Sequence, residues 1–458
     1  MEKLAGVGEA IFALSSGGVP SGVAVIRISG QQAGELVRLY AGKTPPPRRA
    51  SLRTLRLPGT DEAVDQGLVL WFPGPDSFTG EDSAEFHCHG SRSVINALLD
   101  SLAKQPACRP AEPGEFARRA FDNGKLDLTS VEGLADLIDA ETDAQRRQAL
   151  DQTRGSLFDT AETWRERLIE LRAMVEARID FSDEGDVEAA GPLALDRDIE
   201  QLRDDIDAVL ASADRGERVR NGFKVALAGR PNAGKSTLLN ALARREVAIV
   251  TEDPGTTRDI LEVPLDLGGL PVLVYDTAGL RAAAGKAEKE GIRRALVRAG
   301  SSDLVLWLDA PQIGELSKKT RNDSEFSLND SVPIWIVATK SDLGSGDGVP
   351  DLPGDKKSAG KFSISAKTGD GLARLESALR DAASEAMTGD AALTITRIRH
   401  KVILAEIVAD LDAALAAPED VVVGELLRRA GDGLGRLTGR IDVEDVLDQL
   451  FGEFCIGK

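Results

Sequence analysis

One stretch sets the architecture of this chain: FKVALAGRPNAGKS, residues Phe223 to Ser236. It opens with an apolar run typical of a buried strand, and Gly229 to Ser236 then match the phosphate-binding pattern GxxxxGK[ST]. A helix-forming run from Thr237 to Ala243 follows directly. Glycines let backbone amides turn toward phosphate groups, and a helix beginning at the loop adds the positive end of its dipole. This order of strand, loop and helix predicts a P-loop nucleotide site.

Further apolar runs downstream, each followed by turn residues, predict that the P-loop belongs to a doubly wound parallel sheet. The runs are Val272 to Tyr275, Leu304 to Leu308 and Ile334 to Ala338. Two polar stretches, 310–331 and 344–360, are rich in Gly, Ser, Asp and Lys and are expected to form surface loops.

Chemical roles in the phosphate site follow from the residue types. Lys235 is expected to neutralise β- and γ-phosphate oxygens, and the Ser236 hydroxyl to ligate Mg²⁺. Asp276 ends a predicted strand and is placed to hold Mg²⁺ through water, while the Gly279 amide can sense the γ-phosphate. The candidate phosphate-binding residues are Asn232, Ala233, Gly234, Lys235, Ser236, Thr237, Asp276, Thr277, Ala278 and Gly279.

Two later segments that each end a predicted strand resemble the guanine-binding loops of Ras-like GTPases. They are Thr339-Lys340-Ser341-Asp342 and Ser365-Ala366-Lys367. The Asp342 carboxylate can accept both N–H groups of guanine, which favours GTP over ATP. These proteins usually carry Asn where this chain has Thr339, so the replacement changes the side chain that makes one hydrogen bond bracing the loop. A P-loop ATPase driving mechanical work is the alternative, and it would bind ATP as tightly as GTP.

The remainder of the chain has other periodicities. Short apolar runs from about residue 10 to 120, such as Ile11 to Leu14 and Val23 to Ile28, predict a small α+β domain. Apolar or small residues spaced by three or four predict long helices. The helical positions are Leu157, Ala161, Trp164, Leu168, Leu171, Val175 and Ile179, then Ile199, Leu202, Ile206 and Val209, then Leu404, Ile407, Leu411 and Leu415.

These patterns predict a multidomain α/β and α+β fold, in which a Ras-like doubly wound P-loop GTPase domain interrupts a helical domain. The expected divisions are 1–120 for the N-terminal α+β domain, 121–219 for the first helical part, 220–384 for the GTPase domain and 385–458 for the second helical part.

Composition restricts the function classes. The chain has 458 residues with 56 Lys and Arg against 75 Asp and Glu, a formal net charge of −19, so any nucleic-acid contact must be local. Its three cysteines, Cys88, Cys108 and Cys455, have no CxxC spacing, which excludes a disulfide framework or zinc ribbon within one chain. Without a signal-like N-terminus or an apolar run of eighteen residues, a cytoplasmic protein with no membrane segment is expected.

Several sequence blocks together resemble the MnmE (TrmE) family of tRNA modification GTPases. They are Val25 to Gly30, Phe78 to Asp82, Pro113 to Phe116, Arg119 to Leu128, Gly255 to Asp259, Asp276 to Arg281 and Phe454 to Lys458. The resemblance implies a potassium-dependent GTPase that forms a homodimer through its N-terminal domain. It further implies a heterotetramer with an FAD-dependent MnmG-type partner, which adds aminomethyl or carboxymethylaminomethyl groups at C5 of the tRNA wobble uridine. The one-carbon unit would come from 5-formyl- or methylene-tetrahydrofolate.

The resemblance also implies roles for individual residues. Leu280 stands at the position of the Gln that orients attacking water in Ras-like proteins. Glu288 matches the family's glutamate for that task, and the alternative is that Glu288 is a solvated surface charge. Cys455 is either near the folate-bound carbon or a small buried residue. The matching positions are Asn232, Thr251, Asp253 and Thr256 for K⁺, Ser236 and Thr257 for Mg²⁺, Arg27, Glu85, Lys125 and Lys458 for folate, and Glu288, Lys235 and Cys455 for catalysis.

Two other interpretations of the sequence are open. An RNA-binding regulatory GTPase of ribosome assembly would usually carry a basic module, whereas residues 391–458 hold 8 basic and 12 acidic side chains. His87-Cys88-His89 could suggest a metal cluster, but alternate residues of a strand share one face, so further ligands would be needed and a non-metal strand is favoured. His89-Gly90-Ser91 replaces the family's His-Gly-Gly, which bears only on a local turn.

Overall fold

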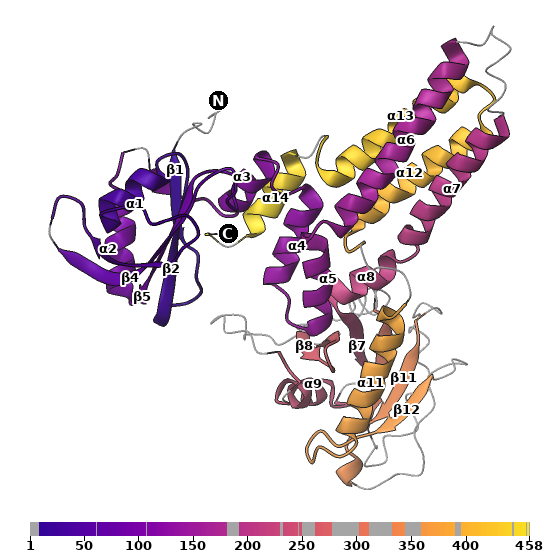
Figure 1. The fold of residues 1–458 in the computed structure, drawn as a ribbon. Helices are drawn as coiled ribbons and strands as arrows, with labels where there is room; N and C mark the ends of the chain where they lie inside the picture. Colours follow the sequence, from indigo (N-terminus) through magenta and orange to yellow (C-terminus); the bar gives the residue numbers. More distant parts are fainter. Residues whose placement is uncertain are drawn as a thin grey trace, which may run out of the picture. The chain divides into compact units, whose positions relative to one another are not determined.

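A computed structural model of the chain divides it into two compact units (Figure 1). The first comprises Met1–Ala135, Gln152–Asp180 and Glu419–Lys458, and the second Asp136–Asp151 and Phe181–Pro418. The structure describes residues 9–60, 62–106, 108–180, 192–229, 232–245, 247–249, 262–276, 302–310, 332–343, 359–389, 395–441, 444–454 and 456–457.

The first unit is built on a six-stranded sheet in the order β3-β4-β5-β2-β1-β6. All its pairs are antiparallel except β1 with β6. The strands are β1 Ala10–Leu14, β2 Ser21–Ser29, β3 Ser51–Arg56, β4 Ala63–Phe72, β5 Ser83–Gly90 and β6 Cys108–Pro110. This sheet confirms the α+β character expected from the short apolar runs near the N-terminus.

Helices cover both faces of this sheet (Figure 1). Helices α1 Ala33–Ala41 and α2 Arg92–Leu102 bury Leu36, Val37, Ile95 and Leu98 in the main core with the inward side chains of the strands. On the other face, Phe116 of α3 Glu115–Asp122 packs against Ile11, Ala13 and Ala111. The second face also carries Arg27 and Glu85, which are partners in the β2–β5 register.

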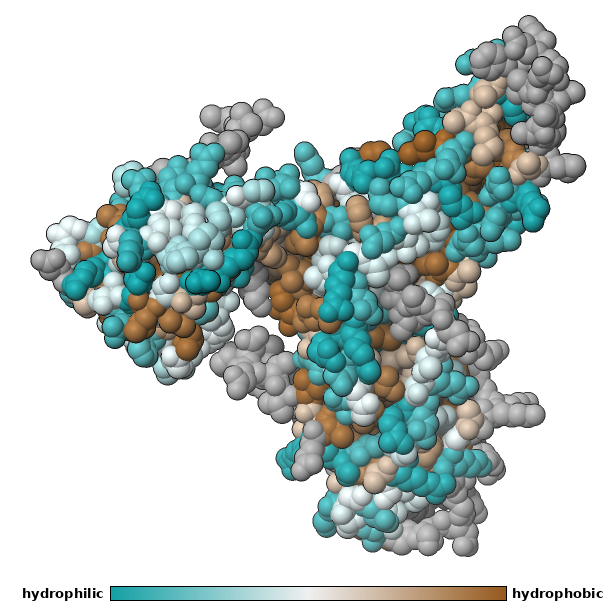
Figure 2. Space-filling model, in the orientation of Figure 1, coloured by the Kyte–Doolittle hydropathy of each residue, from teal (hydrophilic) through white to brown (hydrophobic). Residues whose placement is uncertain are grey.

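The long helix of the first unit confirms the predicted spacing of buried residues along most of the helix. Helix α6 Ser156–Asp180 packs against α13 Asp420–Thr438 and buries six of the seven predicted positions. The seventh, Ile179, is 38% exposed, so that prediction was wrong. The reason is that α13 begins at Asp420, which pairs with Arg178 at 3.1 Å, so the partner helix does not extend over Ile179. Hydrophilic and hydrophobic residues both lie on the surface in the view of Figure 2, and the exposed apolar side chains of α6 and α13 include Ile169, Met174, Val421 and Val422.

Six further helices of the described residues belong to the first unit, to the second unit or, for α4 and α5, contain residues of both. They are α4 Leu128–Ile138, α5 Asp143–Thr153, α7 Pro192–Leu210, α8 Ala213–Asn221, α12 Ile398–Ala416 and α14 Glu444–Glu453. Helix α7 packs against α12 with Ile199, Leu202 and Ile206 buried, whereas Val209 is only half-buried because it lies at the end of its helix. In α12, Leu404, Ile407 and Leu411 are buried and Leu415 is half-buried. No helix among the described residues has the length and hydropathy needed to cross a bilayer.

The second unit holds the predicted doubly wound sheet, in the order β12-β11-β10-β7-β9-β8. All its pairs are parallel except the β8–β9 hairpin. The strands are β7 Phe223–Gly229, β8 Glu262–Asp266, β9 Pro271–Asp276, β10 Leu304–Asp309, β11 Ile334–Ala338 and β12 Gly360–Ser363. The three downstream strands predicted from apolar runs are confirmed as β9, β10 and β11.

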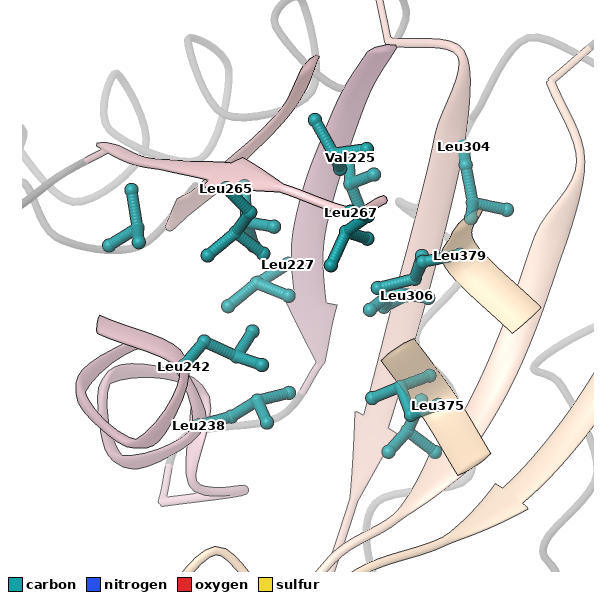
Figure 3. Close-up of a cluster of buried hydrophobic side chains, with 14 of the residues drawn as sticks. Val225, Leu227, Leu238, Leu242, Leu265, Leu267, Leu304, Leu306, Leu375 and Leu379 are labelled. Carbon is teal, nitrogen blue, oxygen red and sulfur yellow. The ribbon is translucent and has the colours of Figure 1, made fainter. Parts of the chain in front are cut away.

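Helices α9 Lys235–Ala243 and α11 Leu372–Met387 share one hydrophobic cluster with the sheet (Figure 3). Leu238 and Leu242 of α9 point toward Leu227 and Leu265, and Leu375 and Leu379 of α11 lie beside Leu304 and Leu306 (Figure 3). A separate cluster on the other face includes Ala226, Val305, Trp307 and Ile336. Burial on both faces explains why β7 and β10 are continuous apolar runs rather than alternating ones.

Candidate nucleotide-binding site

The P-loop of the second unit begins where β7 meets β10. Gly229 has a φ of +139°, and a Cβ added there would lie 2.2 Å from the Leu308 carbonyl oxygen. Asn232 and Gly234 also adopt positive φ values, +60° and +91°. These positive-φ residues turn the chain into the N-terminus of α9, a backbone conformation that glycine adopts without strain and that Asn tolerates better than most other residues. The loop geometry therefore has the form that the GxxxxGK[ST] pattern predicts.

Lys235 is the first residue of α9 and its side chain is buried beside the loop. Its Nζ donates a hydrogen bond to the Gly229 carbonyl oxygen at 2.9 Å. Burial lowers the pKa of Lys235, and the nearby Asp276 carboxylate partly offsets this by favouring the charged form. The structure thus places an amine, held by the loop itself, at the helix terminus where an anion would bind.

Ser236 and Asp276 come together across the β7–β9 pair. The Ser236 Oγ donates a hydrogen bond to Asp276 Oδ2 at 2.9 Å. Asp276 is buried at the carboxyl end of β9, where the register aligns it with Leu227. A hydroxyl and a carboxylate at this distance form the oxygen-only donor set that Mg²⁺ prefers. The residues present therefore fit a magnesium ion at this position.

The two segments that resemble guanine-binding loops, which begin at Thr339 and Ser365 and are called the base-recognition segments below, follow β11 and β12. Asp342 is exposed in a short 3₁₀ turn, and its Oδ1 accepts a hydrogen bond from the buried Ser365 hydroxyl at 2.7 Å. This bond, together with the positive charges of Lys367 and Lys340, lowers the pKa of Asp342. Ala366 is half-buried next to Ser365, and Lys367 is exposed. Asp342 is therefore an oriented carboxylate whose other oxygen is available to accept N–H groups.

Thr339 and Lys340 connect the base-recognition segment to the P-loop. The buried Thr339 hydroxyl donates to the Ala233 carbonyl oxygen at 2.7 Å, and Lys340 Nζ donates to the Asn232 carbonyl oxygen at 3.1 Å. Lys340 has a φ of +58°. The Thr339 hydroxyl therefore makes a hydrogen bond that braces the P-loop at the position where Ras-like proteins usually carry Asn.

A second candidate site lies on the sheet of the first unit. Arg27 pairs with Glu85 through Nε at 3.2 Å and Nη2 at 3.1 Å, and its guanidinium lies 5.5 Å from the Phe78 ring centroid and 5.7 Å from that of Phe116. The other oxygen of Glu85 is 3.0 Å from His87 Nε2. The structure thus brings two of the predicted folate residues into direct contact beside two aromatic rings.

Lys125, the third described residue of the predicted folate set, is exposed near the loop that carries Phe78. That loop is fixed by Asn123 Nδ2, which donates to the Thr79 carbonyl oxygen at 2.7 Å. A Cβ on Gly80 would lie 3.4 Å from Lys125 Cγ, so the lysine stem passes against the loop.

The C-terminal tail joins this sheet, a placement that no local sequence signal revealed. Ile456 bridges Pro113, and the Ser15 hydroxyl donates to the Gly457 carbonyl oxygen at 2.8 Å. A Cβ on Gly457 would lie 2.3 Å from the Leu14 carbonyl oxygen. Leu14 is one residue beyond Ala13, which aligns with Arg27 in the β1–β2 register. The tail therefore lies at the end of β1, near the Arg27 level of the sheet.

The histidine pair of β5 has separate carboxylate partners. His87 contacts Glu85, whereas His89 Nδ1 lies 2.8 Å from Asp65 Oδ1. Within the described ranges, no group of three or more His, Cys, Asp or Glu side chains is arranged to hold a metal ion.

Several predicted site residues lie outside the described residues. They are Thr251, Asp253, Thr256, Thr257, Thr277, Ala278, Gly279, Glu288, Cys455 and Lys458. Leu280, which bears on how water is oriented, is also outside them.

Comparison with known proteins gives matches along almost the whole chain. Residues 10–125 match the family described as GTP-binding protein TrmE N-terminus, and residues 128–455 match the MnmE helical domain. The chain is 48% identical to the tRNA modification GTPase MnmE of Rhodopseudomonas palustris strain BisB5, over 98% of this chain and 99% of that protein. It is 51% identical to the protein of the same name from Methylorubrum populi, over 98% of each. Among solved structures it is similar to Aquifex aeolicus Era Y63A bound to GDP.AlF4-, with 24% identity, a TM-score of 0.27, and coverage of 34% of this chain and 56% of that one.

Proposed function

This chain belongs to the MnmE family of tRNA modification GTPases, and from that premise we propose that it hydrolyses GTP to drive a modification of tRNA. The observation that carries the proposal is the link between the P-loop and the segment that contains Asp342. Thr339 and Lys340 bond successive P-loop carbonyls, while Asp342 is oriented by Ser365. A triphosphate and a guanine base would thus be held by one connected framework.

The phosphate end of the site explains how hydrolysis would be assisted. Lys235 would offset charge on the β- and γ-phosphate oxygens, and the α9 N-terminus would add backbone donors. Mg²⁺ would be held by Ser236 and Thr257, with Asp276 acting through water. K⁺ would be held by Asn232, Thr251, Asp253 and Thr256. When bound, the two cations supply positive charge for the transition state, and Glu288 would orient the attacking water.

The first unit would hold the one-carbon donor. Arg27 and Glu85 offer donors and an acceptor beside the Phe78 and Phe116 rings, a combination suited to a flat heterocycle such as a pterin. Lys125 and Lys458 would bind the anionic tail of 5-formyl- or methylene-tetrahydrofolate. Placement of the C-terminal tail at the end of β1 supports a position for Cys455 and Lys458 near this cluster.

The proposed assembly is a cytoplasmic homodimer joined through the N-terminal domain. With an FAD-dependent MnmG-type partner it would form a heterotetramer that adds aminomethyl or carboxymethylaminomethyl groups at C5 of the wobble uridine. The domains in this proposal are 1–120 for folate binding and dimerisation, 121–219 and 385–458 for the helical domain, and 220–384 for GTP hydrolysis.

The test is GTP hydrolysis by the full chain in potassium and in sodium buffer at matched ionic strength, with wild type and Asn232→Ala. We expect faster turnover in potassium, and loss of that difference in the variant. Equal rates in both salts would contradict the potassium site. The alternative function to test next would then be an RNA-binding regulatory GTPase. The modification state of wobble uridine in cells that lack the protein, with and without Asp342→Asn complementation, then separates these two functions.

A further inference from the structure

Thr339 is the point where the base-recognition strand meets the P-loop. It follows β11, and its backbone N–H donates to the Asp309 carbonyl oxygen at 2.7 Å, which continues the pairing with β10. Its side chain is 4% exposed. Among the described residues, Oγ1 donates toward two main-chain carbonyl oxygens, that of Ala233 at 2.7 Å and that of Asp309 at 3.2 Å.

A threonine hydroxyl has a single hydrogen to donate. Because the acceptors around Thr339 Oγ1 are carbonyl oxygens, that hydrogen is committed to the protein, with Ala233 the nearer partner. Guanine presents two further acceptors, N7 and O6, on the edge opposite its sugar. A donor to N7 is therefore not available from this side chain while it braces the P-loop.

The bond to Ala233 has a direct effect on the phosphate loop. Ala233 lies between Asn232 and Gly234, the two residues with left-handed backbone, and a Cβ on Gly234 would lie 3.7 Å from Thr339 Oγ1. Lys340 holds the preceding carbonyl, that of Asn232. In a planar trans peptide the N–H points away from the C=O, so fixing these two carbonyls also fixes the orientation of the Ala233 and Gly234 amides that follow them.

We propose that Thr339 is a positioning residue of the nucleotide site: its hydroxyl holds the P-loop in its binding conformation and does not donate to the base, so guanine N7 receives no hydrogen bond from this side chain. Guanine is then selected through its N–H groups by Asp342, which Ser365 orients. This inference rests on the proposed GTPase function, and it specifies which atoms of the nucleotide the protein recognises.

The experiment measures the affinity of the full chain for GDP and for 7-deaza-GDP, which lacks the N7 acceptor, by titration calorimetry. Wild type should bind both within about twofold. Thr339→Val keeps the shape of the side chain but leaves the Ala233 carbonyl without its buried donor, so both affinities should fall by about tenfold, the size of one such lost bond. Thr339→Ser keeps the hydroxyl and should bind like wild type.

A gain-of-function variant sharpens the test. The amide of Thr339→Asn has two hydrogens, so one can replace the bond to Ala233 and the other can reach outward. This variant should bind GDP severalfold tighter than 7-deaza-GDP. A tenfold preference of wild type for GDP over 7-deaza-GDP would overturn the proposal, as would unchanged GDP affinity in Thr339→Val.

Asp342→Asn serves as the control for the underlying function. It should lose GDP and gain XDP affinity whatever Thr339 does, because it exchanges an acceptor for a donor facing the base. If wild type bound neither GDP nor 7-deaza-GDP, the proposed GTPase function would fail. If GDP bound and only the predicted ratios were absent, the role of Thr339 alone would fail.

Discussion

The P-loop in the second unit and the Arg27 cluster in the first unit are assembled in opposite ways. The predicted P-loop residues form one continuous segment of the sequence, and Lys235 and Gly229, which are joined by a hydrogen bond, are only six residues apart. The Arg27 cluster uses side chains from separate elements, and the tail beside it is tied to Ser15 across 442 residues. Backbone sites of this kind tolerate few substitutions at glycine, whereas side-chain sites depend on the whole sheet for their geometry.

The largest expected effect is on the second unit alone. Lys235→Ala removes the buried amine at the α9 terminus and should reduce kcat/KM for GTP by about 10²- to 10³-fold, since one preorganised donor facing developing charge is worth that much. Steady-state phosphate release measures it. Lys361→Ala changes an exposed lysine of β12 and should leave turnover unchanged. Equal loss in both variants would mean that general destabilisation, not the amine, is responsible.

Two glycine substitutions test the two sites separately, one in the P-loop and one in the C-terminal tail. In Gly229→Ala the added Cβ meets the Leu308 carbonyl at 2.2 Å, and in Gly457→Ala it meets the Leu14 carbonyl at 2.3 Å. Each should cost about 2–4 kcal/mol locally, because a left-handed or crowded backbone must shift. The first should abolish GDP binding; the second should free the tail and weaken binding of tetrahydrofolate.

Hydrogen exchange of residues 456–457 and calorimetry with GDP separate these two effects. Gly431→Ala is the control, because its Cβ would meet nothing within 4 Å in the interior of α13. It should stabilise the protein by about 0.5–1 kcal/mol. A Gly457→Ala protein with unchanged tail protection would show that the tail contact is unimportant.

A smaller effect is expected from the Arg27 cluster. Arg27→Lys keeps the charge but loses the planar group between the Phe78 and Phe116 rings, so folate affinity should fall by about tenfold, or ~1.4 kcal/mol. GTP turnover should stay within twofold of wild type if the two sites are chemically independent. Fluorescence titration with 5-formyltetrahydrofolate measures the first quantity. Arg38→Lys, in the last turn of α1, is the matched control. Undiminished folate binding would remove Arg27 from the proposed site.

The smallest expected effect is a difference in pH dependence between the units. Burial raises the pKa of Glu115, but hydrogen bonds from Arg109 and the Glu112 amide outweigh it and leave the pKa below the usual 4.5. A lowered carboxyl pKa contributes stability that is present above the unfolded-state value and is lost as pH falls through the folded-state value.

We therefore expect the first unit to lose stability as pH falls below about 4.5, and Glu115→Gln to reduce that loss. Acid titration of unfolding by circular dichroism measures it. GDP affinity, which depends on ionised Asp342, should keep its own acid sensitivity in the variant. If Glu115→Gln left the acid dependence intact, another carboxyl group would be responsible.

Residues that follow a fixed sequence pattern were predictable, whereas contacts between distant segments of the chain were not. Lys235, Ser236, Asp276 and Asp342 were predictable because each lies at or after the carboxyl end of a strand in a fixed pattern, and these ends of parallel strands meet at one edge. The bond from Thr339 to Ala233 was not, since spacing along the chain does not reveal which side chain will reach which carbonyl. Ile179 likewise shows that periodicity predicts a helix face but not where the partner helix begins.

By itself the sequence determined the form of the phosphate loop, the place of the Asp342 carboxylate after a strand and the long amphipathic helices, because these depend on local backbone conformation and on periodicity along one segment. Only the tertiary structure decided that Arg27 meets Glu85 beside two aromatic rings, that the tail at Gly457 contacts the end of β1, and that Thr339 braces the P-loop. These contacts join segments far apart in the chain, and their geometry arises from the packing of whole sheets rather than from any neighbouring residues.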